Sequence, residues 1–308
     1  MVWMVLENLP GVGLAKKHSF LMFLEGVLLS TVGIWTVHYI FPAHTSVLAI
    51  AFVTIGVAPL INKLLCMETQ EEASKPGWAI GFLARHFCIV RVYAWLTIGL
   101  VASFSLWYVV LPAETPTYCT GGSSEIECII PARDSVFAEQ EKTFSTITGK
   151  ATATTGDAAA STGGVGVTEC KDPETRSLGG CFGLIFNNNA IVLGLAILLS
   201  FIYGAGAIFL IGWNASVIGV FIGKEMLNVH VFAGLARAIG YLPHGIPEIM
   251  GYFIGAIAGG VISVEVTKRR FHTKEFWIIT KDAAVLVLLA YAVLAFGALI
   301  EAWLIVGG

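Results

Sequence analysis

Long apolar runs separated by short polar segments make up most of the chain. Residues 20–41, 47–65, 92–111, 246–264 and 283–305 each hold about 20 mostly apolar residues, the length that an α-helix needs to cross a bilayer. A helix satisfies its own backbone hydrogen bonds and can therefore lie in lipid. The pattern predicts an all-α fold, a polytopic transmembrane helix bundle.

A polar segment, residues 112–186, divides these runs into two groups. It is rich in Thr, Ser, Gly and Ala and carries ten acidic and five basic residues. Its tract 146–167 has too few apolar side chains to pack, so we expect it to be mobile. The sequence thus predicts a head (1–19), N-terminal transmembrane helices (20–111), a large loop (112–186) and a transmembrane core (187–308).

Composition and charge indicate a membrane protein with a defined orientation. Of the 308 residues, 56% are hydrophobic and 13% are charged, against roughly 25% charged in an ordinary soluble domain. The net charge of −3 provides no basic face for a nucleic acid, so the lipid bilayer is the expected partner. Basic residues concentrate on the cytoplasmic side of membrane proteins. Eleven of the eighteen lie in the head, in residues 62–91 and in residues 267–281, which predicts a multi-pass protein of the cell membrane with a cytoplasmic N-terminus and an extracytoplasmic loop.

The apolar run 187–223 is difficult to place, because its 37 residues are too many for one transmembrane helix and few for two. The chain must cross the membrane an even number of times between the outer loop and the span 246–264. We therefore expect one helix and then an interrupted one, which returns through residues 216–223 and 232–241. An interrupted helix at membrane depth must lie within protein or against a water-filled cavity.

Four of the six cysteines lie in the loop: Cys119, Cys128, Cys170 and Cys181. Extracytoplasmic surroundings are oxidising, so we expect two disulfides, for which three connectivities are open. The spacings lack the Cys-x-x-Cys pattern that is typical of zinc sites, and we predict no metal site and no cofactor.

Polar residues inside the apolar second half are the candidates for function. One interpretation of residues 243–248 is a helix start, with Pro247 in the first turn and Glu248 complementing the helix dipole. The other pairs His244 with Glu248 as a polar site. Charged residues within a span, such as Glu301, usually face the bundle interior. No enzyme motif is present, so no catalytic residue is predicted. The candidate polar cluster is Asn214, Ser216, His244, Glu248 and Glu301.

Small residues recur at every fourth position in two segments. Small side chains let helix backbones approach closely in lipid, where there is no hydrophobic drive between helices. The pattern predicts two tightly packed helices whose small-residue rows face each other. The rows are Ala215, Gly219 and Gly223, and Gly251, Gly255 and Gly259.

Two segments of the second half are more distinctive than general hydrophobicity would produce. They are GWNASVIG (212–219) and HGIPE (244–248). With the apolar sequence around them they resemble the stage II sporulation protein M family of membrane proteins. The N-terminal pair, LMFLEGVLLSTVGIWTVHYIF and SVLAIAFVTIGVAPLINKLL, is similar to that of the archaeal branch. The resemblance implies a helical membrane fold without an enzymatic motif. Sporulation members are linked to engulfment, as membrane anchors for cell-wall-degrading partners. The loop cysteines are not part of the family pattern.

Two functions of different classes remain open. We favour a scaffold or membrane anchor that organises partner proteins or the bilayer, with the outer loop or the basic inner loop as its contact surface. The alternative is a channel or transporter for a small solute or ion, with a pathway lined by the interrupted helix. A water-filled cavity at the membrane midplane beside His244 and Glu248 would favour the transporter, and a closed bundle would favour the scaffold. Membrane or extracytoplasmic protein partners and a homo-oligomer are compatible with either.

Overall fold

The structure is a computed structural model that describes residues 12–74, 79–114, 131–148, 170, 177–228, 231–269 and 273–307. Every regular element within these residues is a helix. In chain order they are α1 (Val12–Lys17), α2 (Leu21–Ile40), the 3-10 helix η2 (Pro42–His44), α3 (Thr45–Ser74), α4 (Ala79–Val110), α5 (Arg133–Val136), α6 (Ala138–Thr148), α8 (Leu178–Tyr203), α9 (Ala207–Asn228), α10 (Val231–Thr267) and α11 (Lys274–Gly307).

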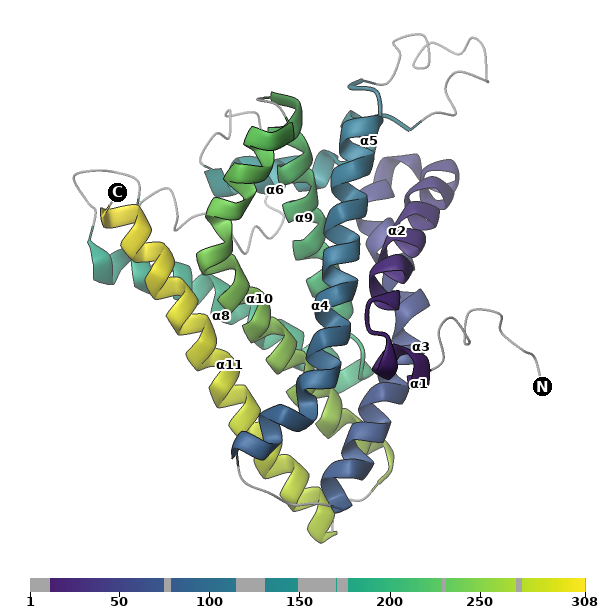
Figure 1. The fold of residues 1–308 in the computed structure, drawn as a ribbon, viewed down its shortest axis with the longest axis vertical. Coiled ribbons are helices and arrows are strands. Elements are labelled where there is room, and N and C mark those ends of the chain that lie inside the picture. Colours follow the sequence, from purple (N-terminus) through teal and green to yellow (C-terminus); the bar gives the residue numbers. More distant parts are fainter. Residues whose placement is uncertain are drawn as a thin grey trace.

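Seven of the described helices are long and apolar enough to cross a membrane. They are α2, α8, α9, α11 and the segments Thr45–Met67 of α3, His86–Val110 of α4 and Ile239–Thr267 of α10. Figure 1 shows α2, α4, α9 and α11 rising through the bundle while α3 and α10 descend and α8 crosses obliquely. The larger of two apolar cores contains buried side chains from all seven helices, and the smaller one lies at the start of α8. The predicted polytopic helix bundle is confirmed.

The predicted interrupted helix is wrong for the part of the chain that the structure describes. Helix α8 begins at Leu178 rather than near Asn187, and the hydroxyl of Ser177 caps it by accepting the N–H of Gly180 at 3.1 Å. The chain then turns at Gly204, whose φ of +66° suits a glycine. Because α8 starts early, the chain has enough residues for two continuous helices, α8 and α9.

Residues 232–241, expected as the second part of the interrupted helix, are instead the first turns of α10. Pro243 and Pro247 both lie inside this helix, so neither begins it, and the helix-start interpretation is also wrong. A proline within a helix removes a backbone hydrogen bond and kinks the axis. In Figure 1 α10 changes direction between its upper and lower parts.

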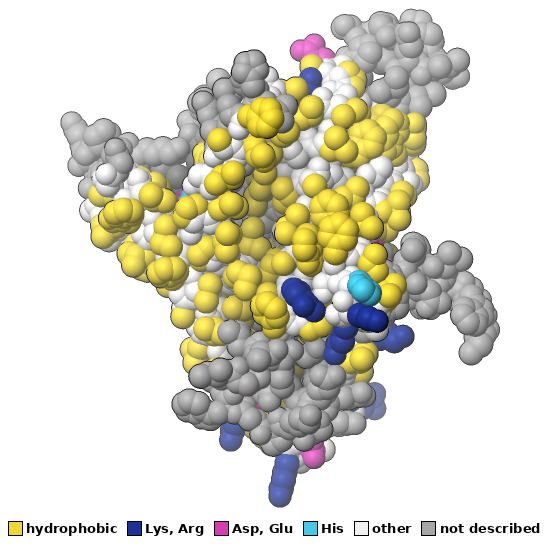
Figure 2. All heavy atoms as spheres, viewed as in Figure 1, with side chains coloured by type: hydrophobic (Ala, Val, Ile, Leu, Met, Phe, Trp, Pro, Cys, Tyr) yellow, Lys and Arg dark blue, Asp and Glu magenta, His cyan; other side chains and the backbone are white. Residues whose placement is uncertain are grey.

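The surface of the bundle separates apolar from basic regions. Figure 2 shows apolar side chains over most of one face, with most of the Lys and Arg side chains toward its lower end. Of the eleven Lys and Arg whose side chains the structure describes, eight lie in α1, in the second half of α3, in the first half of α4, at the end of α10 and at the start of α11. They are Lys16, Lys17, Lys63, Arg91, Lys268, Arg269, Lys274 and Lys281.

Candidate functional site

Two carboxyl side chains and a tyrosine meet between α10 and α11. Tyr252 is buried, and its hydroxyl donates a hydrogen bond of 2.7 Å to Oε1 of Glu248, one turn earlier on α10. Glu301 of α11 lies close enough for its carboxyl group to interact electrostatically with that of Glu248. Neither carboxyl forms an ion pair with any described residue. We call Glu248 and Glu301 the acidic pair.

Close contact between the two helices positions the acidic pair. A Cβ atom on Gly297 of α11 would lie 3.1 Å from Cβ of Pro247 and 3.3 Å from the carbonyl oxygen of His244. A larger residue at this position would therefore push the helices apart. Glu301 lies one turn beyond Gly297 on the same side of α11, which brings it to Glu248.

His244 does not join the acidic pair. Its ring packs against Tyr241 with the centroids 5.7 Å apart, and Tyr241 packs against Phe221 of α9 at 4.9 Å. Its Nδ1 atom is buried and has no hydrogen-bond partner among the described residues. Glu248 bonds to Tyr252 instead, so the expected His244–Glu248 pair does not form by hydrogen bonding in the described structure.

The two predicted residues of α9 also lie apart from the acidic pair. Nδ2 of Asn214 donates to the carbonyl oxygen of Leu210 in its own helix at 2.9 Å. The hydroxyl of Ser216 donates to the carbonyl oxygen of Trp213 at 2.7 Å and accepts a hydrogen bond from Nε2 of Gln140 at 3.2 Å. The predicted cluster therefore divides into an acidic pair and a contact between α9 and the loop.

The contact between Gln140 and Ser216 belongs to a segment of the loop that packs against the helix bundle. The sequence analysis did not predict this packing. Residues 131–143, which we call the loop anchor, pack onto α3, α4 and α9, and Figure 1 shows α6 lying beside the end of α9. Phe137 is fully buried, with ring centroids 6.1 Å from Phe104 and 5.5 Å from Tyr108. Gln140, fully buried as well, reaches Ser216.

Polar contacts hold the loop anchor from three helices. The hydroxyl of Ser46 in α3 donates to the carbonyl oxygen of Val136 at 2.5 Å. Glu141 accepts a hydrogen bond from the hydroxyl of Tyr108 in α4 and lies 3.9 Å from Nζ of Lys224 in α9. One sequence feature could have predicted this packed helix. The apolar pair Val136–Phe137 is followed by strong helix formers, with acidic residues in the first turn of α6.

A second attachment of the loop is a disulfide. Cys170 and Cys181 are joined, with their Cα atoms 5.3 Å apart. Both are buried at the start of α8 with three apolar residues, two of which belong to the last part of α11: Ile185, Ala298 and Ala302. Cys119 and Cys128 lie outside the described residues. No group of three or more His, Cys, Asp or Glu among the described side chains is placed to hold a metal ion.

The two rows of small residues do not face each other, which corrects that expectation. On α9, a Cβ atom at Gly219 would lie 2.8 Å from the carbonyl oxygen of Val101 in α4, and one at Gly223 would lie 3.0 Å from that of Ser105. Ala215, in the same row, is buried. The periodicity correctly marks where helices approach closely, but the small-residue row of α9 faces α4 rather than α10.

The row on α10 meets two other helices. A Cβ atom at Gly251 would lie 3.2 Å from the carbonyl oxygen of Ala290 in α11. Gly255 and Gly259 pack against α8, and a Cβ atom at Gly259 would overlap the carbonyl oxygen of Ile197. The row therefore lies where α10 contacts both α8 and α11.

Seven apolar helices, joined by close backbone contacts around buried polar groups, define a multi-pass helical membrane protein. A family model described as Stage II sporulation protein M matches residues 94–304, well over half of the chain. The chain belongs to this family. The match begins within α4, so α2 and α3 lie before it. Neither the curated proteins nor the solved structures include a match to this chain.

Proposed function

We propose that the protein is a scaffold in the cell membrane that holds its extracytoplasmic loop on the bundle and presents it to partner proteins. The observation that carries this proposal is the loop anchor, in which Phe137 and Gln140 are fully buried against transmembrane helices. A segment that is already immobilised loses less conformational entropy when a partner binds it. The exposed side of α6, which includes Glu139, is left for that contact.

Two further observations support the proposal. A Cβ atom at Gly219, Gly223 or Gly259 would lie within 3.0 Å of a backbone oxygen of the neighbouring helix, and such close helix contacts support a closed bundle. The basic residues at the opposite end from the loop anchor are those that the positive-inside rule assigns to the cytoplasm. That orientation exposes the loop anchor on the extracytoplasmic side.

Photo-crosslinking in native membranes tests the scaffold role. Glu139→benzoylphenylalanine on α6 is expected to give a discrete protein adduct. Leu288→benzoylphenylalanine, at a site 71% exposed on α11, is the matched control and should react with lipid only. Adding Phe137→Asp, which undocks the loop anchor, should abolish the adduct. No protein adduct at Glu139, or equal adducts at both sites, would contradict the proposal.

The acidic pair favours the alternative function, a channel or transporter for a small cation or proton. Ionisable residues within a span are rare and often mark ion pathways. Purified protein in proteoliposomes would then carry a proton or cation flux above that of empty vesicles, and Glu248→Gln or Glu301→Gln would remove it. Vesicles as tight as protein-free controls would leave the scaffold as the better account.

A further inference from the structure

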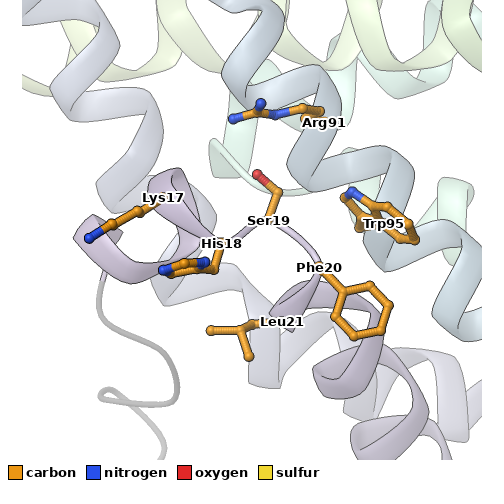
Figure 3. A pocket seen from close by; sticks show the side chains of 7 residues that line it. All are labelled: Lys17, His18, Ser19, Phe20, Leu21, Arg91 and Trp95. Carbon is orange, nitrogen blue, oxygen red and sulfur yellow. The ribbon is translucent and has the colours of Figure 1, made fainter.

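A surface cavity of about 500 Å³ lies where α1 and the first turn of α2 pack against α4. Figure 3 shows the guanidinium of Arg91 extending from α4 above Ser19, toward the side on which Lys17 and His18 lie. The ring of Trp95 lies on the other side of Ser19. The lining residues are Lys17, His18, Ser19, Phe20, Leu21, Arg91 and Trp95.

The polar side of the cavity is basic. Lys17, His18 and Arg91 are all exposed, and no acidic side chain lines the cavity. Nη2 of Arg91 donates to the carbonyl oxygen of Lys16 at 3.3 Å, and the guanidinium lies 5.9 Å from the ring centroid of Phe87. These contacts orient the guanidinium while leaving donors for a ligand, since an Arg side chain has five N–H groups.

The other side of the cavity is aromatic. The rings of Phe20 and Trp95 meet edge to face, with centroids 5.1 Å apart, and Phe20 is 50% exposed. Phe20 lies at the boundary of the apolar region, because the apolar helix α2 begins at Leu21, and its contact with Trp95 places that ring at the same level. Tryptophan is enriched at this depth, where lipid headgroups meet acyl chains.

We propose that this cavity binds the phosphate group of an anionic phospholipid. Arg and Lys side chains bind phosphate oxygens through charge-assisted hydrogen bonds. Cavities of about 300–1,000 Å³ accommodate small ligands of headgroup size. Arg91 and Lys17 bind the phosphate, and the acyl chains leave across Phe20 and Trp95 into the bilayer. The site does not depend on the scaffold role, because it lies at the end of the bundle opposite the loop anchor.

Binding to the purified full-length protein in mixed micelles tests this site. Phosphatidylglycerol, phosphatidylcholine and inorganic phosphate are titrated separately, and the dissociation constants are measured by thermophoresis. Phosphatidylglycerol should bind saturably. Phosphatidylcholine should bind much more weakly, because its choline group meets the basic side chains, and inorganic phosphate should bind weakly because it lacks acyl chains.

Variants that each remove one positive charge locate the site. Arg91→Gln and Lys17→Gln should each weaken phosphatidylglycerol binding about tenfold, the effect of losing one hydrogen bond between charged groups. Lys274→Gln, which removes an exposed charge at the same end of the bundle but outside the cavity, should change nothing. Lys17 is the safer variant, because the Arg91 side chain also contacts the backbone of α1. Equal binding by wild type and both cavity variants would overturn the proposal. So would equal affinity for phosphatidylcholine, or inorganic phosphate binding as tightly as the lipid.

Discussion

Replacing Gly259 with alanine should destabilise the bundle through one helix contact. The added Cβ would overlap the carbonyl oxygen of Ile197 and lie 2.9 Å from Cβ of Ser200, both in α8. These atoms cannot rotate away, so α10 and α8 must separate. Overpacking costs about 1–3 kcal/mol, and an overlap with backbone atoms lies in the upper half of that range, about 2–3 kcal/mol. Alanine regains at most about 1 kcal/mol through its higher helix propensity. We therefore expect Gly259→Ala to lower the free energy of unfolding by about 1–2 kcal/mol.

Two other glycines of α10 supply the controls for this prediction. At Gly255 the nearest atom to a new Cβ is Cδ1 of Leu193, the flexible end of a side chain, so Gly255→Ala should cost less than Gly259→Ala. At Gly240 no atom lies within 4 Å, so Gly240→Ala should be neutral or stabilising. Equilibrium unfolding by SDS in mixed micelles, followed by circular dichroism, measures all three. If Gly259→Ala is as stable as wild type, or Gly255→Ala is the worse of the two, the reasoning from the backbone contact fails.

The remaining predictions concern the two rows, the orientation and the disulfide. Gly219 packs on α4 and Gly255 on α8, so the losses of unfolding free energy from Gly219→Ala and Gly255→Ala should add within about 0.5 kcal/mol in the double variant. A larger coupling energy would mean that the two small-residue rows touch. In a background without Cys66 and Cys88, Lys274→Cys should react with an impermeant maleimide only after the membrane is permeabilised, and labelling of intact cells would reverse the orientation. Mass spectrometry of non-reduced peptides should find Cys170 linked to Cys181, whereas alkylation of either without reduction would contradict the pairing.

The transmembrane helices are largely predictable because the bilayer imposes their length and composition. Residues 20–41 were expected as the first span, and α2 covers Leu21–Ile40. The start of α8 was less accessible to prediction. Ser177 is a good helix cap, but Gly180 follows where a capping box would place Glu or Gln, and residues 187–189 are three asparagines in a membrane helix. The missed start of α8 led directly to the false interruption in the next helix.

Contacts between residues far apart in the chain could not be predicted from the sequence, because the periodicity of small residues does not show which helix packs against them. Gly219 signals a close approach, yet only the arrangement of seven helices places α4 opposite it. Similarly, the polar sequence around Gln140 is typical of an exposed loop, but the side chain is buried and donates a hydrogen bond to Ser216. The acidic pair joins residues of two helices whose proximity depends on the contact at Gly297.

The loop touches the bundle at two places that belong to different helices. The loop anchor is held by α3, α4 and α9, whereas Cys170 is held at the start of α8 against the end of α11. A solute pathway between helices does not need the loop anchor, whereas a protein that presents α6 to a partner loses less entropy on binding when α6 is already held in place. For that reason the loop, rather than the acidic pair, is the part of the molecule on which the proposed function rests.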